Sequence, residues 1–157
     1  MIRVLIVDDH AVMRAGLEQL LAQAEDIEVV GTAADGAQAL TQARELAPDV
    51  VLMDLRMPRL DGLAATREIV SDPSLSGTQV VVLTTFDEDE DIQAAMRAGA
   101  AGYLLKDLSP DELRRAVHVV AGGAALLAPA ITRRVMQQLA ATAGTLNPAL
   151  LADLTER

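Results

Sequence analysis

Short, mostly apolar runs alternate with amphipathic segments along the first 122 residues of the chain. Runs of this length, bounded by charges or turn residues, predict strands buried on both faces of a parallel sheet. The predicted strands cover residues 4–7, 27–31, 50–54, 79–83 and 102–105.

A helix is predicted after each of these strands. The first places Met13, Leu17, Leu20 and Leu21 on one apolar face at helical spacing. Others begin at recognisable caps, such as Asp35 with Gln38 three residues on. Five strands alternating with five helices predict a doubly wound α/β fold, flavodoxin-like, with strand order 2-1-3-4-5 and helices on both faces.

Beyond residue 123 the pattern changes. Residues 129–139 could form one more helix, whereas residues 140–149 have the composition of a linker, and residues 150–157 are too short for a domain. The sequence therefore divides into a domain over residues 1–122 and a helical extension with a linker over residues 123–157.

Composition narrows the function. The formal net charge of −10 disfavours general binding to nucleic acid or to an anionic membrane. The chain has no cysteine, which suits a reducing cytoplasm, and no apolar segment approaches the roughly 20 residues of a membrane helix. We find no signal peptide, because Asp8 and Asp9 interrupt the first apolar run. The expected location is the cytoplasm.

The polar and charged residues that could take part in chemistry directly follow or end the predicted strands. Asp8 and Asp9 follow the first strand, Asp54 the third, Thr84 the fourth and Lys106 the fifth. The first and third strands are neighbours at the point where strand order reverses, so the three carboxylates should converge. Clustered carboxylates repel one another, and a hard cation such as Mg²⁺ would compensate them.

This set is typical of an aspartyl-phosphate site. Asp54 is the candidate nucleophile, while Lys106 supplies a positive charge and Thr84 a hydroxyl donor for phosphoryl oxygens. Each residue also has a plainer interpretation. Asp8 and Asp9 could cap a helix, Asp54 could be a loop acid, Thr84 a cap, Lys106 a solvated charge and Tyr103 a core residue. Their joint placement at strand ends favours the site.

The chain closely resembles the receiver domain of two-component response regulators, in the branch found in NarL/FixJ-family (LuxR-type) transcription factors. The resemblance spans about residues 2–122 and rests on residues 7–10, 14–17, 54–58, 61–62, 83–86 and 102–107. Asp107 stands where many receivers carry proline, but the NarL-like branch commonly has aspartate there. The fold implied is CheY-like.

The resemblance implies that Asp54 accepts a phosphoryl group from a sensor histidine kinase. Mg²⁺ would be held by Asp9, Asp54 and the backbone carbonyl of Arg56, with Asp8 acting through water. Thr84 and Tyr103 would be the switch residues, and Lys106 would pair with the phosphoryl group. Phosphorylation would promote a homodimer, without enzymatic turnover of a separate substrate.

The last four residues resemble the opening of the family's helix-turn-helix domain. We therefore expect a chain truncated before that domain, which would contact DNA only through the missing part.

Two alternatives remain. A dehalogenase-type phosphatase also uses a strand-end aspartate, but it needs a second aspartate where this chain has Arg56. An atypical receiver could serve as a protein-binding module without being phosphorylated.

Overall fold

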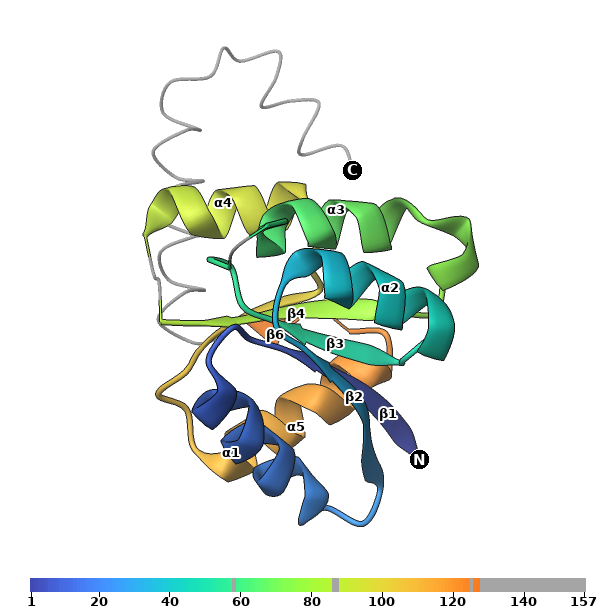
Figure 1. Ribbon diagram of the computed structural model, residues 1–157. Coiled ribbons are helices and arrows are strands. Elements are labelled where there is room, and N and C mark those ends of the chain that lie inside the picture. Colours follow the sequence, from blue (N-terminus) through green and yellow to red (C-terminus); the bar gives the residue numbers. More distant parts are fainter. Residues whose placement is uncertain (58, 86–87, 125, 128–157) are drawn as a thin grey trace, which may run out of the picture.

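The strands and helices alternate along the chain (Figure 1). The computed structural model describes residues 1–57, 59–85, 88–124 and 126–127. Within these residues the strands are β1 (Ile2–Val7), β2 (Ile27–Ala33), β3 (Val50–Met53), β4 (Gln79–Thr84), β5 (Gly102–Leu105) and β6 (Leu126–Leu127). The helices are α1 (Ala11–Ala22), α2 (Gly36–Leu46), α3 (Gly62–Ser71), α4 (Asp89–Arg97) and α5 (Pro110–Ala121), with a 3-10 turn η1 (Pro73–Leu75).

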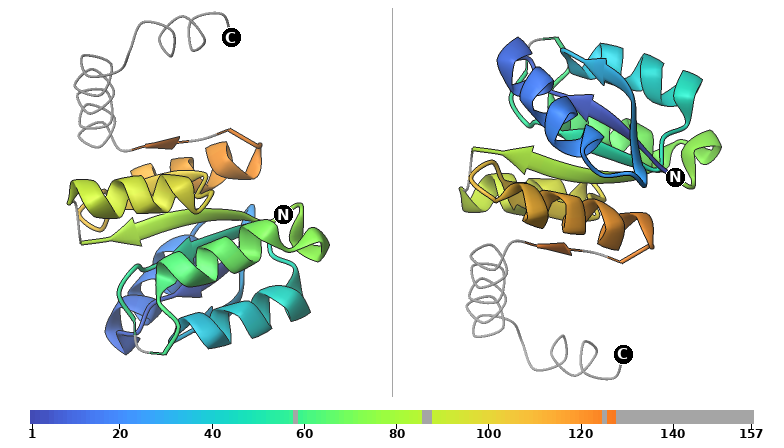
Figure 2. Two further views of the ribbon diagram at one scale, coloured as in Figure 1. Left: turned by 90° about the horizontal axis from the view of Figure 1, so that it is seen from above. Right: turned by 90° about the horizontal axis from the view of Figure 1, so that it is seen from below.

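The sheet is parallel and has the order β2-β1-β3-β4-β5-β6. The predicted fold class and the order 2-1-3-4-5 are confirmed. The short strand β6 was not predicted; it pairs with β5 at Gly102 and Tyr103, on the edge farthest from β2 (Figure 2). The helix predicted over residues 129–139, and the segments after it, lie outside the described residues.

Helices cover the sheet on both faces, with α1 and α5 on one face and α2, α3 and α4 on the other (Figures 1 and 2). Alternation along the strands decides which side chain meets which layer. Ile6 and Leu52 pack with α1 and α5, whereas Val7 and Met53 pack with α2 and α3. Because both faces are covered, β3 is wholly apolar, and β4 carries polar side chains only at its two ends, Gln79 and Thr84.

Local signals fix the starts of α2 and α5 as the sequence predicts. Asp35 accepts a hydrogen bond from the Gln38 amide at 2.8 Å, and the Gln38 side chain accepts one from the Ala34 amide at 2.9 Å. Ser109 caps α5, with Pro110 at the first helical position. These caps satisfy backbone groups that a helix end leaves without partners.

Candidate functional site

The site lies at the carboxyl ends of β1, β3, β4 and β5. Asp8 directly follows β1, Asp54 follows β3, and Lys106 follows β5, while Thr84 is the last residue of β4. Ladder-type hydrogen bonds continue into these residues, from the Asp54 amide to the Val7 carbonyl at 3.0 Å and from the Lys106 amide to the Thr84 carbonyl at 2.9 Å. The structure thus brings the predicted strand-end groups to one edge of the sheet.

Lys106 joins two buried carboxylates. Its Nζ lies 2.6 Å from Asp8 Oδ2 and 3.5 Å from Asp54 Oδ2. The side chains of Lys106, Asp8 and Asp54 are 9%, 2% and 5% exposed, so the ion pairs are shielded from water. A lysine held this way is a fixed positive charge beside the candidate nucleophile, which contradicts the plainer interpretation of a solvated charge.

Burial raises the pKa of the Asp54 carboxyl above its usual range. Lys106 opposes this change by favouring the charged form, and Asp8 adds to it by repulsion. The Leu55 amide donates a hydrogen bond to Asp54 Oδ1 at 2.9 Å, which orients the carboxylate. Asp54 is therefore a buried acid whose charge needs further compensation.

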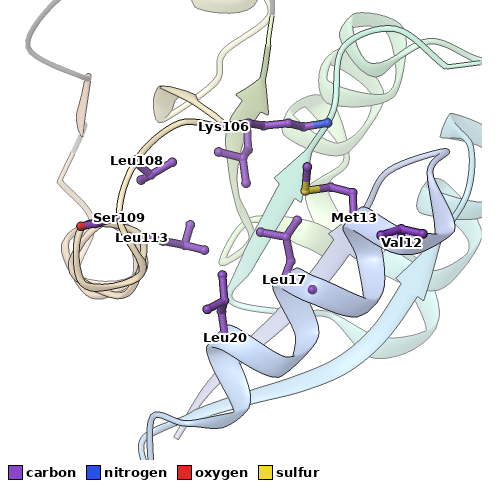
Figure 3. A pocket seen from close by; sticks show the side chains of 10 residues that line it. Val12, Met13, Leu17, Leu20, Lys106, Leu108, Ser109 and Leu113 are labelled. Atoms are coloured by element: carbon purple, nitrogen blue, oxygen red, sulfur yellow. The ribbon is translucent and has the colours of Figure 1, made fainter.

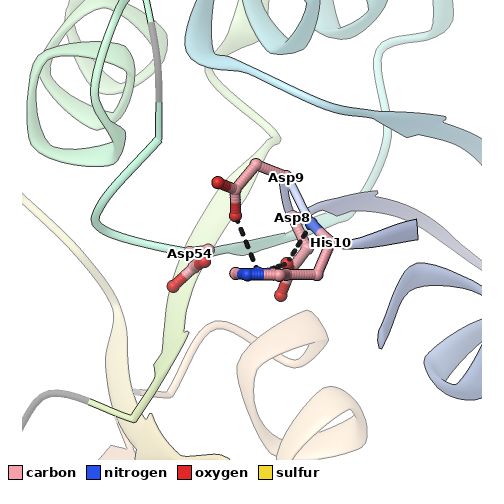
Figure 4. Close-up of side chains that lie close together, drawn as sticks. All are labelled: Asp8, Asp9, His10 and Asp54. Atoms are coloured by element: carbon pink, nitrogen blue, oxygen red, sulfur yellow. Dashed lines mark hydrogen bonds and ion pairs between the residues drawn. The ribbon is translucent and has the colours of Figure 1, made fainter. Parts of the chain in front are cut away.

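Asp9 and His10 complete an acidic cluster with Asp8 and Asp54 (Figure 4). One ligand atom from each of the four residues lies within 4.8 Å of the others, so the group could hold a metal ion. Asp9 Oδ1 is buried without a hydrogen-bond partner in the part of the chain described, although His10 Nδ1 is 3.0 Å away in an ion pair that requires a protonated ring. A hard divalent cation fits this oxygen-rich set, because carboxylate oxygens are its preferred ligands.

His10 and Arg14 both contact Asp8, although the sequence analysis did not assign either residue to the site. The His10 amide donates to Asp8 Oδ1 at 2.9 Å, and its ring nitrogen Nδ1 lies 3.3 Å from the same oxygen. The Arg14 guanidinium donates to the Asp8 carbonyl at 2.7 Å. The three consecutive residues Asp8, Asp9 and His10 were the available signal, since the turn after β1 keeps them together.

Arg56 lies in the loop after β3, and its guanidinium Nη2 pairs with Asp91 Oδ2 of α4 at 3.1 Å. The metal-binding role expected of its backbone carbonyl stays a prediction. Thr84 and Tyr103 are both fully buried, and Tyr103 packs with Leu55 and Ile92. Their predicted switch movement also stays a prediction.

A cavity of about 290 Å³ adjoins the site between α1 and the start of α5 (Figure 3). Lys106 forms part of its wall, and the remaining lining is mostly apolar, including Met13, Leu17, Leu20 and Leu113. No carboxylate lines it, so the acidic cluster lies outside this cavity.

A doubly wound sheet with clustered acids and a buried lysine at one edge defines a receiver-type fold. The response regulator receiver domain family matches residues 4–118, and the chain belongs to this family. The relatives it matches include response regulators of the NarL and LuxR type, as the sequence predicted.

Two curated relatives show the extent of the similarity. The transcriptional regulatory protein LnrK of Bacillus subtilis (strain 168) is 41% identical over 163 residues, covering 100% of this chain and 73% of LnrK. The nitrate/nitrite response regulator protein NarL of Escherichia coli (strain K12) is 41% identical over 142 residues, covering 90% of this chain and 65% of NarL. The chain thus spans less than two thirds of the length of NarL.

Solved structures agree with the fold. A two-component response regulator of the LuxR family from Aurantimonas sp. SI85-9A1 superposes with a TM-score of 0.81 at 31% identity, covering 88% of this chain and 97% of that chain.

Among the described residues, none of the helices is both long and apolar enough to cross a membrane.

Proposed function

We propose that this chain is a phosphoacceptor: Asp54 takes a phosphoryl group from a sensor histidine kinase and thereby switches the conformation of the domain. The observation that carries the proposal is the position of Lys106, whose ammonium group lies between the buried carboxylates of Asp8 and Asp54. Membership of the receiver family supports it.

The proposed chemistry uses groups of this chain. An Asp54 carboxylate oxygen would form the new O–P bond while the P–N bond of the donor's phosphohistidine breaks and its electron pair stays on the imidazole nitrogen. Lys106 and the Thr84 hydroxyl would stabilise charge on the phosphoryl oxygens. In this proposal the domain is not an enzyme with a separate substrate, because the protein itself carries the product.

Charge at the site supports a role for Mg²⁺. Asp8, Asp9 and Asp54 carry three negative charges, and Lys106 supplies one positive charge. A divalent cation would balance the remainder, and a phosphoryl group adds further negative charge. Asp9, Asp54 and the Arg56 carbonyl, with Asp8 through water, would hold Mg²⁺, which would neutralise the phosphoryl oxygens.

After phosphorylation of Asp54, we propose that Thr84 moves toward the phosphoryl group, that the Tyr103 side chain changes orientation, and that the domain then forms a homodimer. The receiver unit would comprise residues 1–122, with residues 123–157 as an extension. Because LnrK is named a transcriptional regulatory protein, we extend control of transcription in the cytoplasm to this chain as part of the proposal.

The experiment is the intact mass of the protein after incubation with acetyl phosphate and Mg²⁺. Wild-type protein should gain one phosphoryl group, and EDTA should prevent the gain. Asp54→Asn should gain none, because the amide is not nucleophilic. Asp49→Asn is a matched control, since Asp49 lies at the opposite end of the same strand and accepts a hydrogen bond from the Arg3 amide at 2.9 Å.

Size-exclusion chromatography with beryllium fluoride tests the switch. A shift to a dimer in wild type but not in Asp54→Asn supports the proposed dimerisation, and an equal shift in both proteins refutes it. Absence of any phosphoryl gain, with no response to beryllium fluoride, would favour an atypical receiver that binds partners without being phosphorylated.

A further inference from the structure

The loop between β3 and α3 carries the candidate nucleophile at its start, and backbone groups hold it at two points. The Gly62 amide, in the first turn of α3, donates to the Leu55 carbonyl at 2.8 Å. The Gly36 amide, at the first position of α2, donates to the Leu60 carbonyl at 2.9 Å. Both ends of the loop are thus hydrogen-bonded to helix starts.

At Gly36 and at Gly62, a backbone carbonyl lies too close to the glycine to leave room for any side chain. A Cβ atom on Gly62 would lie 1.9 Å from the Asp54 carbonyl oxygen, and one on Gly36 would lie 2.1 Å from the Leu60 carbonyl oxygen. Ordinary van der Waals contact requires about 3.5 Å, so a methyl group at either position must displace backbone rather than a flexible side chain. Glycine is required here by space, since neither residue has a positive φ.

Gly36 is the more informative of the two. It comes from a different part of the chain, follows the buried cap residue Asp35, and has no contact with the acidic cluster among its closest neighbours. Asp35 Oδ2 also lies 3.7 Å from Arg59 Nη1, and Arg59 has a left-handed backbone with φ of 66°. The turn before α2 therefore fixes the far end of the loop that begins at Asp54.

We propose that Gly36 is a positioning residue for phosphoryl transfer: its close contact with Leu60 sets the path of the loop that carries Asp54 and Arg56. This inference rests on the proposed function. Displacement of reacting groups by about 1 Å can lower a rate by 100-fold, so an added methyl group at residue 36 should disturb the site without touching it.

The test compares Gly36→Ala with wild type at a temperature where circular dichroism shows both to be folded. We expect the initial rate of phosphorylation by acetyl phosphate to fall by at least 10-fold. Mg²⁺ binding, measured by calorimetry without phosphodonor, should weaken as well, because the loop supplies part of the proposed cation site. A merely structural role would lower the melting temperature and leave Mg²⁺ affinity unchanged.

Gly77→Ala is the matched control, because a Cβ at Gly77 would have no heavy atom within 4 Å apart from those of residue 77 and its two chain neighbours. A second pair of variants covers the case in which Gly36→Ala does not fold. Asp35→Ala removes the cap of α2 beside the contact, and Asp72→Ala removes a cap far from the site, on η1. Asp35→Ala should slow phosphorylation several-fold more than Asp72→Ala.

The outcomes separate the two proposals. Wild-type rates and Mg²⁺ affinity in folded Gly36→Ala, or equal rates in Asp35→Ala and Asp72→Ala, would overturn the positioning role while wild-type phosphorylation still stands. If wild type neither gains a phosphoryl group nor responds to beryllium fluoride, the proposed function fails, and the Mg²⁺ affinities still decide whether Gly36 positions the loop. Wild type that neither gains a phosphoryl group nor binds Mg²⁺ would overturn both.

Discussion

Replacing Lys106 by methionine removes the only lysine of the chain and keeps most of the aliphatic side chain. The change leaves the Asp8 and Asp54 carboxylates, which are 2% and 5% exposed, without the ammonium group that lies 2.6 Å and 3.5 Å from them. In wild type this ammonium offsets part of the repulsion between the two acids. We therefore expect Lys106→Met to lose stability, although the substitution places an apolar side chain in a mostly buried position.

The size of the loss follows from the geometry. At an effective dielectric constant of about 20, charges separated by 2.6 Å and 3.5 Å attract by about 6 and about 5 kcal/mol. Desolvation of the three groups offsets much of this attraction, and removing one member of a buried pair typically costs about 3–5 kcal/mol. Asp54 can relieve the repulsion by taking up a proton, because its pKa is already raised by burial. We expect a loss of about 3 kcal/mol at neutral pH.

Urea denaturation in EDTA, followed by circular dichroism, measures this loss. Adding Mg²⁺ should restore more stability to Lys106→Met than to wild type, because the cation would compensate carboxylates that no longer have a partner. A ligand at 100 times its dissociation constant adds about 2.7 kcal/mol, which is readily measured. Arg44→Met is the control, since it removes a half-exposed arginine paired with Asp72 away from the site. Equal stability of Lys106→Met and wild type in EDTA, with equal gains in Mg²⁺, would refute the reasoning.

Three further predictions concern pH and packing. Burial raises the pKa of Asp54 above 3.8, so the folded state binds the proton more tightly, and wild type loses stability as pH rises from 3.8 through the raised pKa. Asp54→Asn should therefore gain in melting temperature relative to wild type over that pH range. A difference in melting temperature that does not change with pH would contradict this. The Asp26 carboxylate raises the pKa of His118 above 6.5, so this pair stabilises the fold between the lowered pKa of Asp26 and pH 6.5, and the contribution disappears as pH rises through the folded-state pKa of His118. His118→Gln should flatten that pH dependence of the melting temperature, and an unchanged dependence would contradict this. Leu52→Ala, in the centre of β3 and 1% exposed, should cost about 2–5 kcal/mol in urea denaturation, and a cost below 1 kcal/mol would argue against the packing described.

The strands could be predicted from the sequence because burial on both faces of the sheet allows few residue types other than apolar ones. A strand such as β3 is covered on both faces, so residues 50–53 must be apolar, and Asp54 marks where the strand ends. Capping signals act locally, and Asp35 and Ser109 therefore begin helices where the sequence predicted them. The convergence of Asp8 and Asp54 followed from strand order alone.

Contacts that depend on side-chain direction or on distant backbone were not predictable. His10 carries no spacing signal relative to another ligand, yet the turn after β1 places its ring beside Asp8. β6 has two residues, too few for a periodicity. The Gly36 contact joins residues 24 positions apart through a carbonyl oxygen, and a sequence names neither the carbonyl nor the missing Cβ as the reason for the glycine.

In the proposed phosphoryl transfer, Lys106 would change partners. In the structure its ammonium lies closer to Asp8 than to Asp54, by 2.6 Å against 3.5 Å, so a phosphoryl group on Asp54 would compete with Asp8 for it. The strands β4 and β5 resist movement relative to each other, because Thr84 pairs with Leu105 in the ladder directly before Lys106. Thr84 is also fully buried, which leaves its hydroxyl little room to turn unless the adjoining loop moves. Any response to phosphorylation should therefore begin in the loops that follow β3, β4 and β5, and hydrogen exchange should change there before it changes within the strands.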